Sequence, residues 1–336
     1  MVWSIQIFVR FLIFIVFLCP LANLRAAPRP DAPWKDRSPH KSSFVQANGI
    51  RLHYLDWGGK GETILLLSGM GVTPHIYDDL APQLTMNFRV LGLTRRGLRP
   101  SDVPTTGYDN ANLVRDIVGF LDALSIRRVI LIGHSMAGDE MTAFANLYPG
   151  RARALVYLDA AYDHSLFNQL MDKDPLQNSP SKGDLASFED SKEWYVRNVG
   201  IWSDAVEADS RTANLRTDGT MRIDSMPPNV SNALFQEMAA YHPDYSAIRR
   251  PILAFYAIMP THPGILPGTS PEMREKAQAF WDQSWKPYQR REIDALKTSG
   301  ATVRVVEMQG VPHLCFIRPQ DQAVVVATIK GFLSGR

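Results

Sequence analysis

Short apolar runs alternate with amphipathic stretches along most of the chain, and this alternation restricts the possible folds more than any other feature. Six runs have the length and apolar character of buried strands, and they span residues 63–67, 88–93, 128–132, 154–158, 252–257 and 302–306. Helical patterns lie between or after these runs, at residues 75–84, 110–124, 136–148, 271–298 and 320–333. Strands that alternate with helices predict an α/β fold whose mostly parallel central sheet is flanked by helices.

One interval interrupts the alternation. Residues 164–247 separate two predicted strands by more than eighty positions and contain helical patterns at 191–201 and 231–241. An insertion of this length in an α/β domain is usually a lid or a small second domain, and decoration without a functional role is the alternative. We therefore predict an α/β core formed by residues 43–163 and 248–336, interrupted by a mainly helical cap.

The N-terminal segment differs in character from this core. Residues 11–18 form an apolar run directly after Arg10, and small residues follow it. This pattern predicts a secretory signal peptide over residues 1–26 and hence a secreted or periplasmic protein. The alternative is an uncleaved anchor over residues 2–22, through which alone the chain would associate with a membrane. Residues 27–42 contain four prolines and mixed charges, which is typical of a solvated linker.

Charge and cysteine content argue against several classes of protein. The chain has 36 Lys and Arg against 34 Asp and Glu, whereas a nucleic-acid-binding protein needs a strongly basic face. Its two cysteines do not make a disulfide framework or a cysteine-rich zinc site. The sequence also lacks a pair of histidines at His-Glu-x-x-His spacing. We therefore expect no nucleic-acid partner, no metal and no cofactor.

The strongest catalytic signal is the segment that contains Ser135. The strand predicted at 128–132 runs directly into a Gly-x-Ser-x-Ala motif, from Gly133 to Ala137, and then into a helix. A strand, tight turn and helix in this order form a nucleophile elbow, in which backbone strain exposes the serine hydroxyl. The residues two positions before and after the serine must be small, and both are. The helix that follows directs its positive N-terminal end at a developing oxyanion, so Ser135 is the candidate nucleophile.

With this motif in that position, residues 43–336 resemble the α/β-hydrolase superfamily, whose cap corresponds to the insertion. In this family the loop after the third strand commonly carries a His-Gly-x motif that supplies one oxyanion N–H. Here the loop is residues 68–71, Ser-Gly-Met-Gly, with serine in place of histidine. The resemblance therefore implies an oxyanion hole made by the backbone N–H groups of Met70 and Met136, which do not depend on side-chain identity.

A serine nucleophile needs a base and an acid that orients the base. His313 is the candidate base, because it lies in the loop after the last strand, where the resemblance places the catalytic histidine. The family most often carries the acid after the seventh strand, but residues 257–265 contain no Asp or Glu. Some members, including a group of haloalkane dehalogenases, carry it after the sixth strand, where this chain has Asp159. Asp163 is the alternative acid, four residues later.

The identity of the nucleophile narrows the expected reaction. Related dehalogenases and epoxide hydrolases use Asp at the elbow, so Ser135 argues against both activities. A serine implies attack on a carbonyl, an acyl-enzyme, and hydrolysis by water activated through His313. Apolar and aromatic residues in the insertion favour a small-molecule carboxylic ester with a hydrophobic part as the substrate.

Other activities use the same three residues. An aminopeptidase of the proline-iminopeptidase kind would bind a free amino terminus with carboxylates of the cap, and four acidic residues are compatible with this: Asp184, Glu189, Asp190 and Glu193. Lactonase, C–C hydrolase and perhydrolase activities are further alternatives. A binding module that kept the fold without catalysis is the last alternative.

Overall fold

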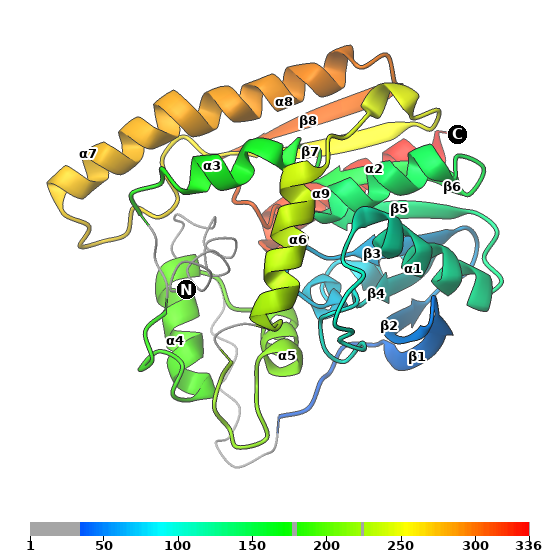
Figure 1. The fold of residues 1–336 in the computed structure, drawn as a ribbon, viewed down its shortest axis with the longest axis horizontal. Helices are drawn as coiled ribbons and strands as arrows, with labels where there is room; N and C mark the ends of the chain where they lie inside the picture. The colour runs from blue at the N-terminus through cyan, green and yellow to red at the C-terminus, as the bar shows by residue number, and fades with distance from the viewer. Residues whose placement is uncertain (1–33, 177–179, 223–224, 336) are drawn as a thin grey trace.

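The predicted apolar runs form strands in a computed structural model, which describes residues 34–176, 180–222 and 225–335 (Figure 1). Strands covered on both faces carry near-continuous apolar side chains, and every residue of the central strand β5 is buried. The strands are β1 (Lys41–Ala47), β2 (Ile50–Gly58), β3 (Thr63–Leu67), β4 (Arg89–Leu93), β5 (Val129–His134), β6 (Ala152–Leu158), β7 (Ile252–Ile258) and β8 (Val303–Gln309).

These eight strands form one sheet with the order β1-β2-β4-β3-β5-β6-β7-β8. The pairs from β4 to β8 are parallel, whereas β2 pairs antiparallel with both β1 and β4. The predicted α/β fold with a mostly parallel sheet is therefore confirmed. The carboxyl ends of the parallel strands meet at one edge of the sheet, which is where open α/β sheets bind their ligands.

Helices follow or separate the strands. The α-helices are α1 (Asn110–Ala123), α2 (Ala137–Leu147), α3 (Phe167–Met171), α4 (Phe188–Val199), α5 (Asp204–Ala213), α6 (Pro228–Ala240), α7 (Pro271–Phe280), α8 (Lys286–Thr298) and α9 (Pro319–Ser334). A π-helical turn, Trp281–Trp285, joins α7 to α8.

The segment predicted as a helix at 75–84 is instead two short 3-10 helices. These are η2 (Pro74–Tyr77) and η3 (Ala81–Gln83), and each has a proline in its first turn. Proline has no N–H to donate and its ring clashes with the preceding turn, so Pro82 prevents one continuous α-helix here. Two further 3-10 helices, η4 (His164–Leu166) and η5 (Tyr245–Ala247), form the two ends of the insertion.

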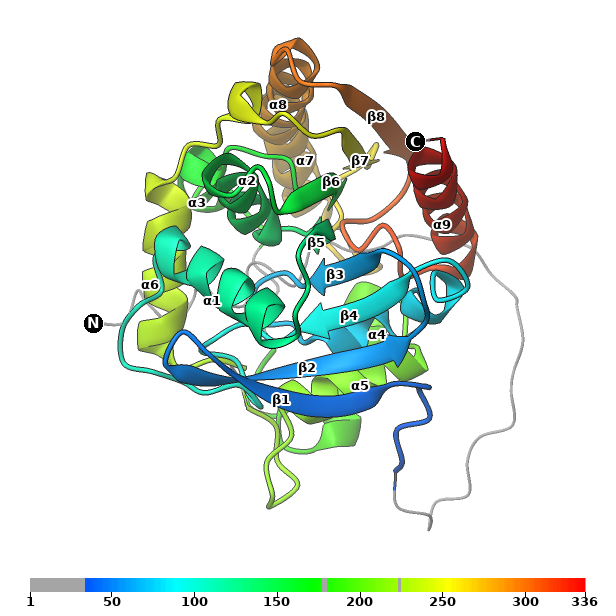
Figure 2. The ribbon, with the colours of Figure 1, turned by 90° about the vertical axis from the view of Figure 1, so that its right-hand side faces the viewer.

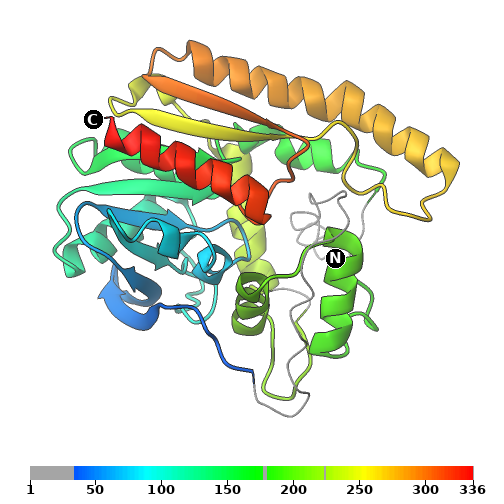
Figure 3. The ribbon, with the colours of Figure 1, turned by 180° about the vertical axis from the view of Figure 1, so that it is seen from behind.

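Each strand divides its side chains between two hydrophobic layers. On β3, Leu65 and Leu67 pack in a cluster with residues of α1, α2 and α8, whereas Ile64 and Leu66 pack in a second cluster with η2 and α9. The two layers are visible in Figure 2, where α1 and α9 lie on opposite sides of the sheet, and α9 covers the near face in Figure 3. Apolar surface is buried on both faces of the sheet. Each Å² removed from water contributes about 25 cal/mol, and this burial stabilises the sheet that carries the site.

Between β6 and β7 the chain leaves the sheet and forms α3 to α6 (Figure 1). Helix α6 contributes Val230 and Leu234 to a third hydrophobic cluster, which also contains Met70 and Met136. The insertion is therefore packed against the loops that follow β3 and β5.

The chain before β1 is described from residue 34 onward, and the predicted signal peptide, residues 1–26, lies outside the described residues. Residues 34–40 belong to the predicted linker. Trp34, Lys35, Arg37 and Pro39 are exposed, whereas Ser38 and His40 contact η2 and its C-terminal end. The His40 side chain is only 7% exposed, and the Ser38 hydroxyl donates a hydrogen bond to Asp78. Among the described residues, none of the helices combines the length and the apolar character needed to cross a bilayer.

Candidate active site

Ser135 stands in the tight turn between β5 and α2. Its backbone φ is 57°, in the left-handed region that a non-glycine residue rarely adopts. A Cβ atom on Gly133 would lie 3.0 Å from the Cβ of Ala137, and one on Gly138 would lie 1.8 Å from the carbonyl oxygen of Ala160. Small residues are therefore required on both sides of the serine. The Ser135 hydroxyl is buried, and it has no hydrogen-bond partner within the described part of the chain.

His313 and Asp159 come together from the ends of two strands. His313 follows β8, Asp159 follows β6, and the His313 Nδ1 atom lies 2.6 Å from a carboxylate oxygen of Asp159. The other carboxylate oxygen accepts hydrogen bonds from the Tyr162 hydroxyl at 2.5 Å and from the backbone N–H of Ala257 at 3.0 Å. The carboxylate is thus held by three donors, and it fixes the imidazole tautomer in which Nδ1 carries the proton and Nε2 is the basic atom.

Asp163, the alternative acid, is bonded elsewhere. One of its carboxylate oxygens accepts the backbone N–H of Ser165, and the other lies 3.0 Å from Nδ1 of His242. Burial opposes ionisation, but the hydrogen bonds from His242 and Ser165 outweigh it and hold the pKa of Asp163 below its ordinary value. The structure therefore brings His313 together with Asp159 and gives Asp163 a separate partner.

His134, the residue before the nucleophile, contacts the loop that carries His313. Its Nε2 atom lies 3.2 Å from the backbone carbonyl oxygen of His313, and the two imidazole rings are 4.3 Å apart between centroids. Burial, with the neighbouring His313 ring, lowers the pKa of His134 well below its ordinary value. The neutral ring of His134 donates its Nε2–H to this carbonyl and so holds the His313 loop next to the end of β5.

The loop after β3 runs beside the nucleophile. A Cβ atom on Gly69 would lie 3.0 Å from Nδ1 of His134 and 3.2 Å from the Cβ of Ser135, which is tighter than ordinary side-chain contacts, so glycine favours this close approach. Met70 follows in this loop, while Met136 follows Ser135 and stands at the N-terminus of α2. Met70 and Met136, the two residues predicted to form the oxyanion hole, are thus adjacent to the turn that holds Ser135.

Arg95 fixes the position of this loop. Its guanidinium donates to the backbone carbonyl of Ser68 at 2.7 Å and to that of Gly69 at 3.1 Å. The same side chain forms a buried ion pair with Glu140 in the first turn of α2. Arg95 therefore connects the loop that contains Met70 to the helix that follows Ser135.

An aromatic pocket opens above these groups. Trp281, Trp285 and Tyr288 are spaced four and three residues apart, so they lie on one face of the long helix α7–α8. Trp281 and Trp285 are stacked, with 5.5 Å between ring centroids and 12° between ring planes. The residues that line this pocket are Ser135, Asp159, Tyr162, His164, Phe167, Ala257, Met259, Trp281, Trp285, Tyr288, Gln289 and His313.

Two polar side chains in the pocket wall were missed in the sequence. The Nδ1 atom of His164 lies 3.0 Å from a carboxylate oxygen of Asp139 on α2. Burial opposes a charge on this imidazole, but the Asp139 carboxylate outweighs it and raises the pKa of His164. Gln289 on α8 donates to the Tyr162 hydroxyl at 2.8 Å, so it supports the residue that in turn supports Asp159. Their partners come from distant segments, and no local spacing identifies them.

The chain is similar to a known protein family and to several curated enzymes. A family model described as "alpha/beta hydrolase fold" matches residues 62–221. A curated relative is the 2-(acetamidomethylene)succinate hydrolase of Mesorhizobium japonicum, 26% identical over 206 residues, which are 58% of this chain and 70% of that protein. The N-formylmaleamate deformylase of Pseudomonas putida is 38% identical over 118 residues, 34% of this chain and 43% of that enzyme.

Among solved structures, that of an E-2-(acetamidomethylene)succinate hydrolase superposes with a TM-score of 0.64 at 19% identity. The superposition covers 88% of this chain and 99% of the other. An identity this low bears on the fold alone, and here the fold agrees over nearly the whole length of both chains.

Proposed function

This chain belongs to the α/β-hydrolase superfamily, and from that premise we propose that it is a serine hydrolase that forms an acyl-enzyme from carboxylic esters with a hydrophobic part. One observation carries the proposal above all others. His313 and Asp159, joined by a hydrogen bond of 2.6 Å, line the same pocket as Ser135, whose backbone is strained and whose hydroxyl has no hydrogen-bond partner among the described residues.

In the proposed reaction, Nε2 of His313 accepts the Ser135 proton as the hydroxyl oxygen attacks the ester carbonyl. Asp159 stabilises the imidazolium that forms. The N–H groups of Met70 and Met136 donate to the oxyanion, where fixed donors are worth more than in water. His313 then protonates the leaving alcohol, and in the second half it activates the water that releases the acid.

The pocket supports a substrate with an apolar part. Its wall carries five aromatic rings of the Phe, Tyr and Trp type, contributed by the loop after β6, by η4–α3 and by α7–α8. We further propose that the insertion at 164–247 acts as the cap, because His164 and Phe167 at its start belong to this wall. The chain of the acyl or alcohol group would lie against the stacked Trp281 and Trp285.

The aminopeptidase alternative receives less support. Among the described residues that line the pocket, Asp159 is the one carboxylate, and it is bonded to His313. Asp184 is paired instead with Arg197, and Asp190 is bonded to the Ser187 hydroxyl at the start of α4. The relatives act on varied compounds, among them an acetamidomethylene succinate and an N-formyl compound, so amide substrates belong in the test.

Two measurements test the proposal. A fluorophosphonate should label the wild-type protein once, at Ser135, and should not label a folded Ser135→Ala variant. A panel of p-nitrophenyl esters with graded acyl chains, prolyl arylamides and N-acyl arylamides should give the highest kcat/KM for the esters, with the value rising as the chain lengthens. Folded protein that resists labelling would contradict the serine mechanism, whereas preferred hydrolysis of an arylamide would contradict only the ester assignment.

A further inference from the structure

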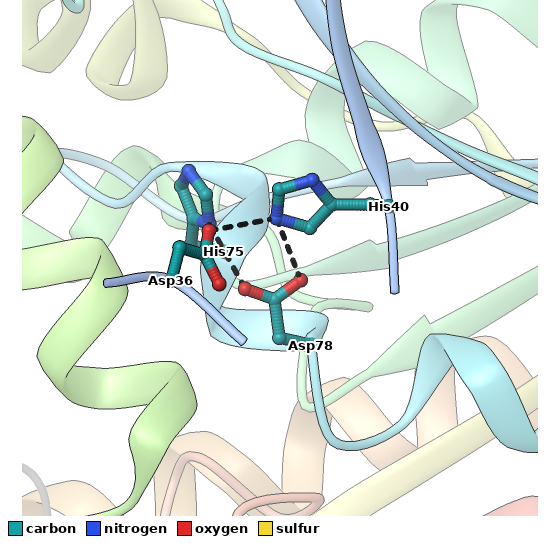
Figure 4. Close-up of side chains that lie close together, drawn as sticks. All are labelled: Asp36, His40, His75 and Asp78. Carbon is teal, nitrogen blue, oxygen red and sulfur yellow. Dashed lines mark hydrogen bonds and ion pairs between the residues drawn. The ribbon is translucent and has the colours of Figure 1, made fainter. Parts of the chain in front are cut away.

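A second cluster of functional side chains lies away from the proposed active site. Asp36 and His40 come from the segment before β1, and His75 and Asp78 come from η2 and its C-terminal end. Figure 4 shows the two imidazole rings and the two carboxylates directed toward one another. The two pairs are separated by an entire hairpin and β3 in the sequence, so their spacing did not predict a common site.

The nitrogen–oxygen distances between the histidines and carboxylates of this cluster run from 2.9 to 3.6 Å, which spans hydrogen-bond lengths and the ligand–ligand separations of a metal site. The Nε2 atom of His40 lies 3.0 Å from an oxygen of Asp36 and 3.6 Å from an oxygen of Asp78. The Nδ1 atom of His75 lies 2.9 Å from Asp78 and 3.5 Å from Asp36. One ligand atom from each residue can be chosen so that all four lie within 4.8 Å of one another. Ligands about 2.0–2.2 Å from a tetrahedral zinc ion are about 3.3–3.6 Å apart.

We propose that Asp36, His40, His75 and Asp78 bind one divalent cation of the zinc type. Imidazole nitrogens and carboxylate oxygens suit Zn²⁺, and four protein ligands leave no open position, which is typical of a structural site and not of a catalytic one. Two carboxylates and two neutral imidazoles carry a charge of −2, which the ion neutralises. In the metal-free chain, hydrogen bonds of His40 with Asp36 and of His75 with Asp78 join the same atoms, and the ion would replace them.

Burial and charge around the cluster favour the ion. The side chains of His40, His75 and Asp78 are 4–8% exposed, whereas that of Asp36 is 25% exposed and opens toward solvent. A cavity on this side is lined by five carboxylates, those of Asp36, Asp78, Asp79, Asp204 and Glu207, which outnumber its two cationic residues, Lys35 and Arg37. These carboxylates attract cations and give an access route to the ligands. Trp57 donates its indole N–H to Asp78 at 2.9 Å and fixes the orientation of that ligand.

The ion would connect two segments that the sheet does not hold together. It would fasten residues 34–40 to η2, and η2 is tied to the sheet by the hydrogen bond from Tyr77 to the carbonyl of Leu67. The proposed role is therefore stabilisation of the chain before β1 and of the turn that follows the oxyanion loop. It does not depend on the identity of the substrate.

The test measures metal binding, which is independent of activity. After treatment with EDTA, the full chain should bind about one equivalent of Zn²⁺ by titration calorimetry, and bound Co²⁺ should give the visible spectrum of a tetrahedral site. Saturation with Zn²⁺ should raise the thermal midpoint by roughly 5 °C. His40→Gln and His75→Gln should each weaken Zn²⁺ binding by more than the roughly 10–100-fold that loss of an outer-shell partner costs.

His242→Gln is the matched control. This substitution also removes a His–Asp pair, because Nδ1 of His242 lies 3.0 Å from a carboxylate oxygen of Asp163. The His242 side chain is exposed, however, and the pair does not belong to a four-residue cluster of the described chain. This variant should bind Zn²⁺ as the wild type does. A wild-type chain that binds no Zn²⁺, or His40→Gln and His75→Gln variants that bind it undiminished, would overturn the site. An unchanged midpoint with Zn²⁺ bound would overturn the stabilising role, and none of these results bears on fluorophosphonate labelling of Ser135.

Discussion

Asp159 and Asp163 lie four residues apart after β6, yet their carboxylates have different surroundings. Asp159 is 3% exposed and bonds His313, whereas Asp163 bonds the exposed His242. We expect Asp159→Asn to lower kcat by roughly 10³–10⁴-fold, because an amide no longer enforces the productive imidazole tautomer. Asp163→Asn should retain most of the turnover. Steady-state kinetics on the best ester of the panel measures both, and the reverse order of effects would move the acid to Asp163.

At the scale of single residues, the sequence predicts side chains whose role depends on the neighbouring sequence. It does not predict side chains whose role depends on partners far away in the chain. The sequence predicts Ser135 because strand, motif and helix are contiguous, and it predicts His313 because the resemblance places the catalytic histidine after the last strand. His164 and Gln289 are not found, because their partners Asp139 and Tyr162 lie 25 and 127 residues away. Asp159 is intermediate, since a resemblance was needed to prefer it over the usual position after the seventh strand.

Among the elements, α5 shows how the insertion is fixed to the core. Asp209 on α5 is buried, and one of its oxygens accepts hydrogen bonds from both the backbone N–H and the hydroxyl of Thr73, each at 2.6 Å. Thr73 stands three residues after Met70. Burial outweighs these hydrogen bonds and raises the pKa of Asp209 to about 6, so the contact carries a buried charge at neutral pH.

This charge predicts a pH dependence of stability. Between pH 3.8 and about 6 the folded chain retains a proton on Asp209 that the unfolded chain has released, so the free energy of unfolding falls as pH rises through this window. Asp209→Asn keeps an oxygen acceptor and does not titrate. The difference in the free energy of unfolding between Asp209→Asn and wild type should therefore shift in favour of the variant by roughly 3 kcal/mol as the pH rises from 3.8 to above about 6.

Urea unfolding of both proteins at several pH values measures this difference. Glu193→Gln, which removes an exposed carboxylate on α4 in the same insertion, is the control and should leave the shape of the wild-type curve unchanged. Parallel curves for Asp209→Asn and wild type would show that the folded state does not perturb this carboxyl.

The elements themselves were predicted with unequal success, for identifiable reasons. The β3 bounds agree to the residue, because Thr63–Leu67 is a continuous apolar run between polar turns. Helix α5 was not predicted, because its buried face consists of small residues, such as Ala205 and Ala208, that carry a weak hydrophobic signal. The segment at 75–84 was predicted as one helix, because its apolar spacing was helical even though Pro82 interrupts the hydrogen bonding.

For the whole molecule, the prediction concerns the N-terminal segment and the compartment to which it would direct the protein. We propose export, with cleavage after Ala26 removing Arg10 and Arg25 and making the formal net charge zero. The expected result in a host with a secretory pathway is a protein outside the cytoplasm whose first residue is Ala27, as measured by intact mass and N-terminal sequencing. Recovery of the full-length chain in the membrane fraction would favour the anchor instead.

The stacked indoles of Trp281 and Trp285 also make the pocket optically distinctive. Two indole rings 5.5 Å apart are close enough for their electronic transitions to couple, and we expect a paired signal of opposite signs in circular dichroism when the transition directions within the two ring planes differ. Because both rings belong to the pocket wall, a ligand seated against them changes this signal and the fluorescence of the pair. The protein thus contains its own reporter of pocket occupancy, which can be read on an unlabelled chain and with compounds that it does not turn over.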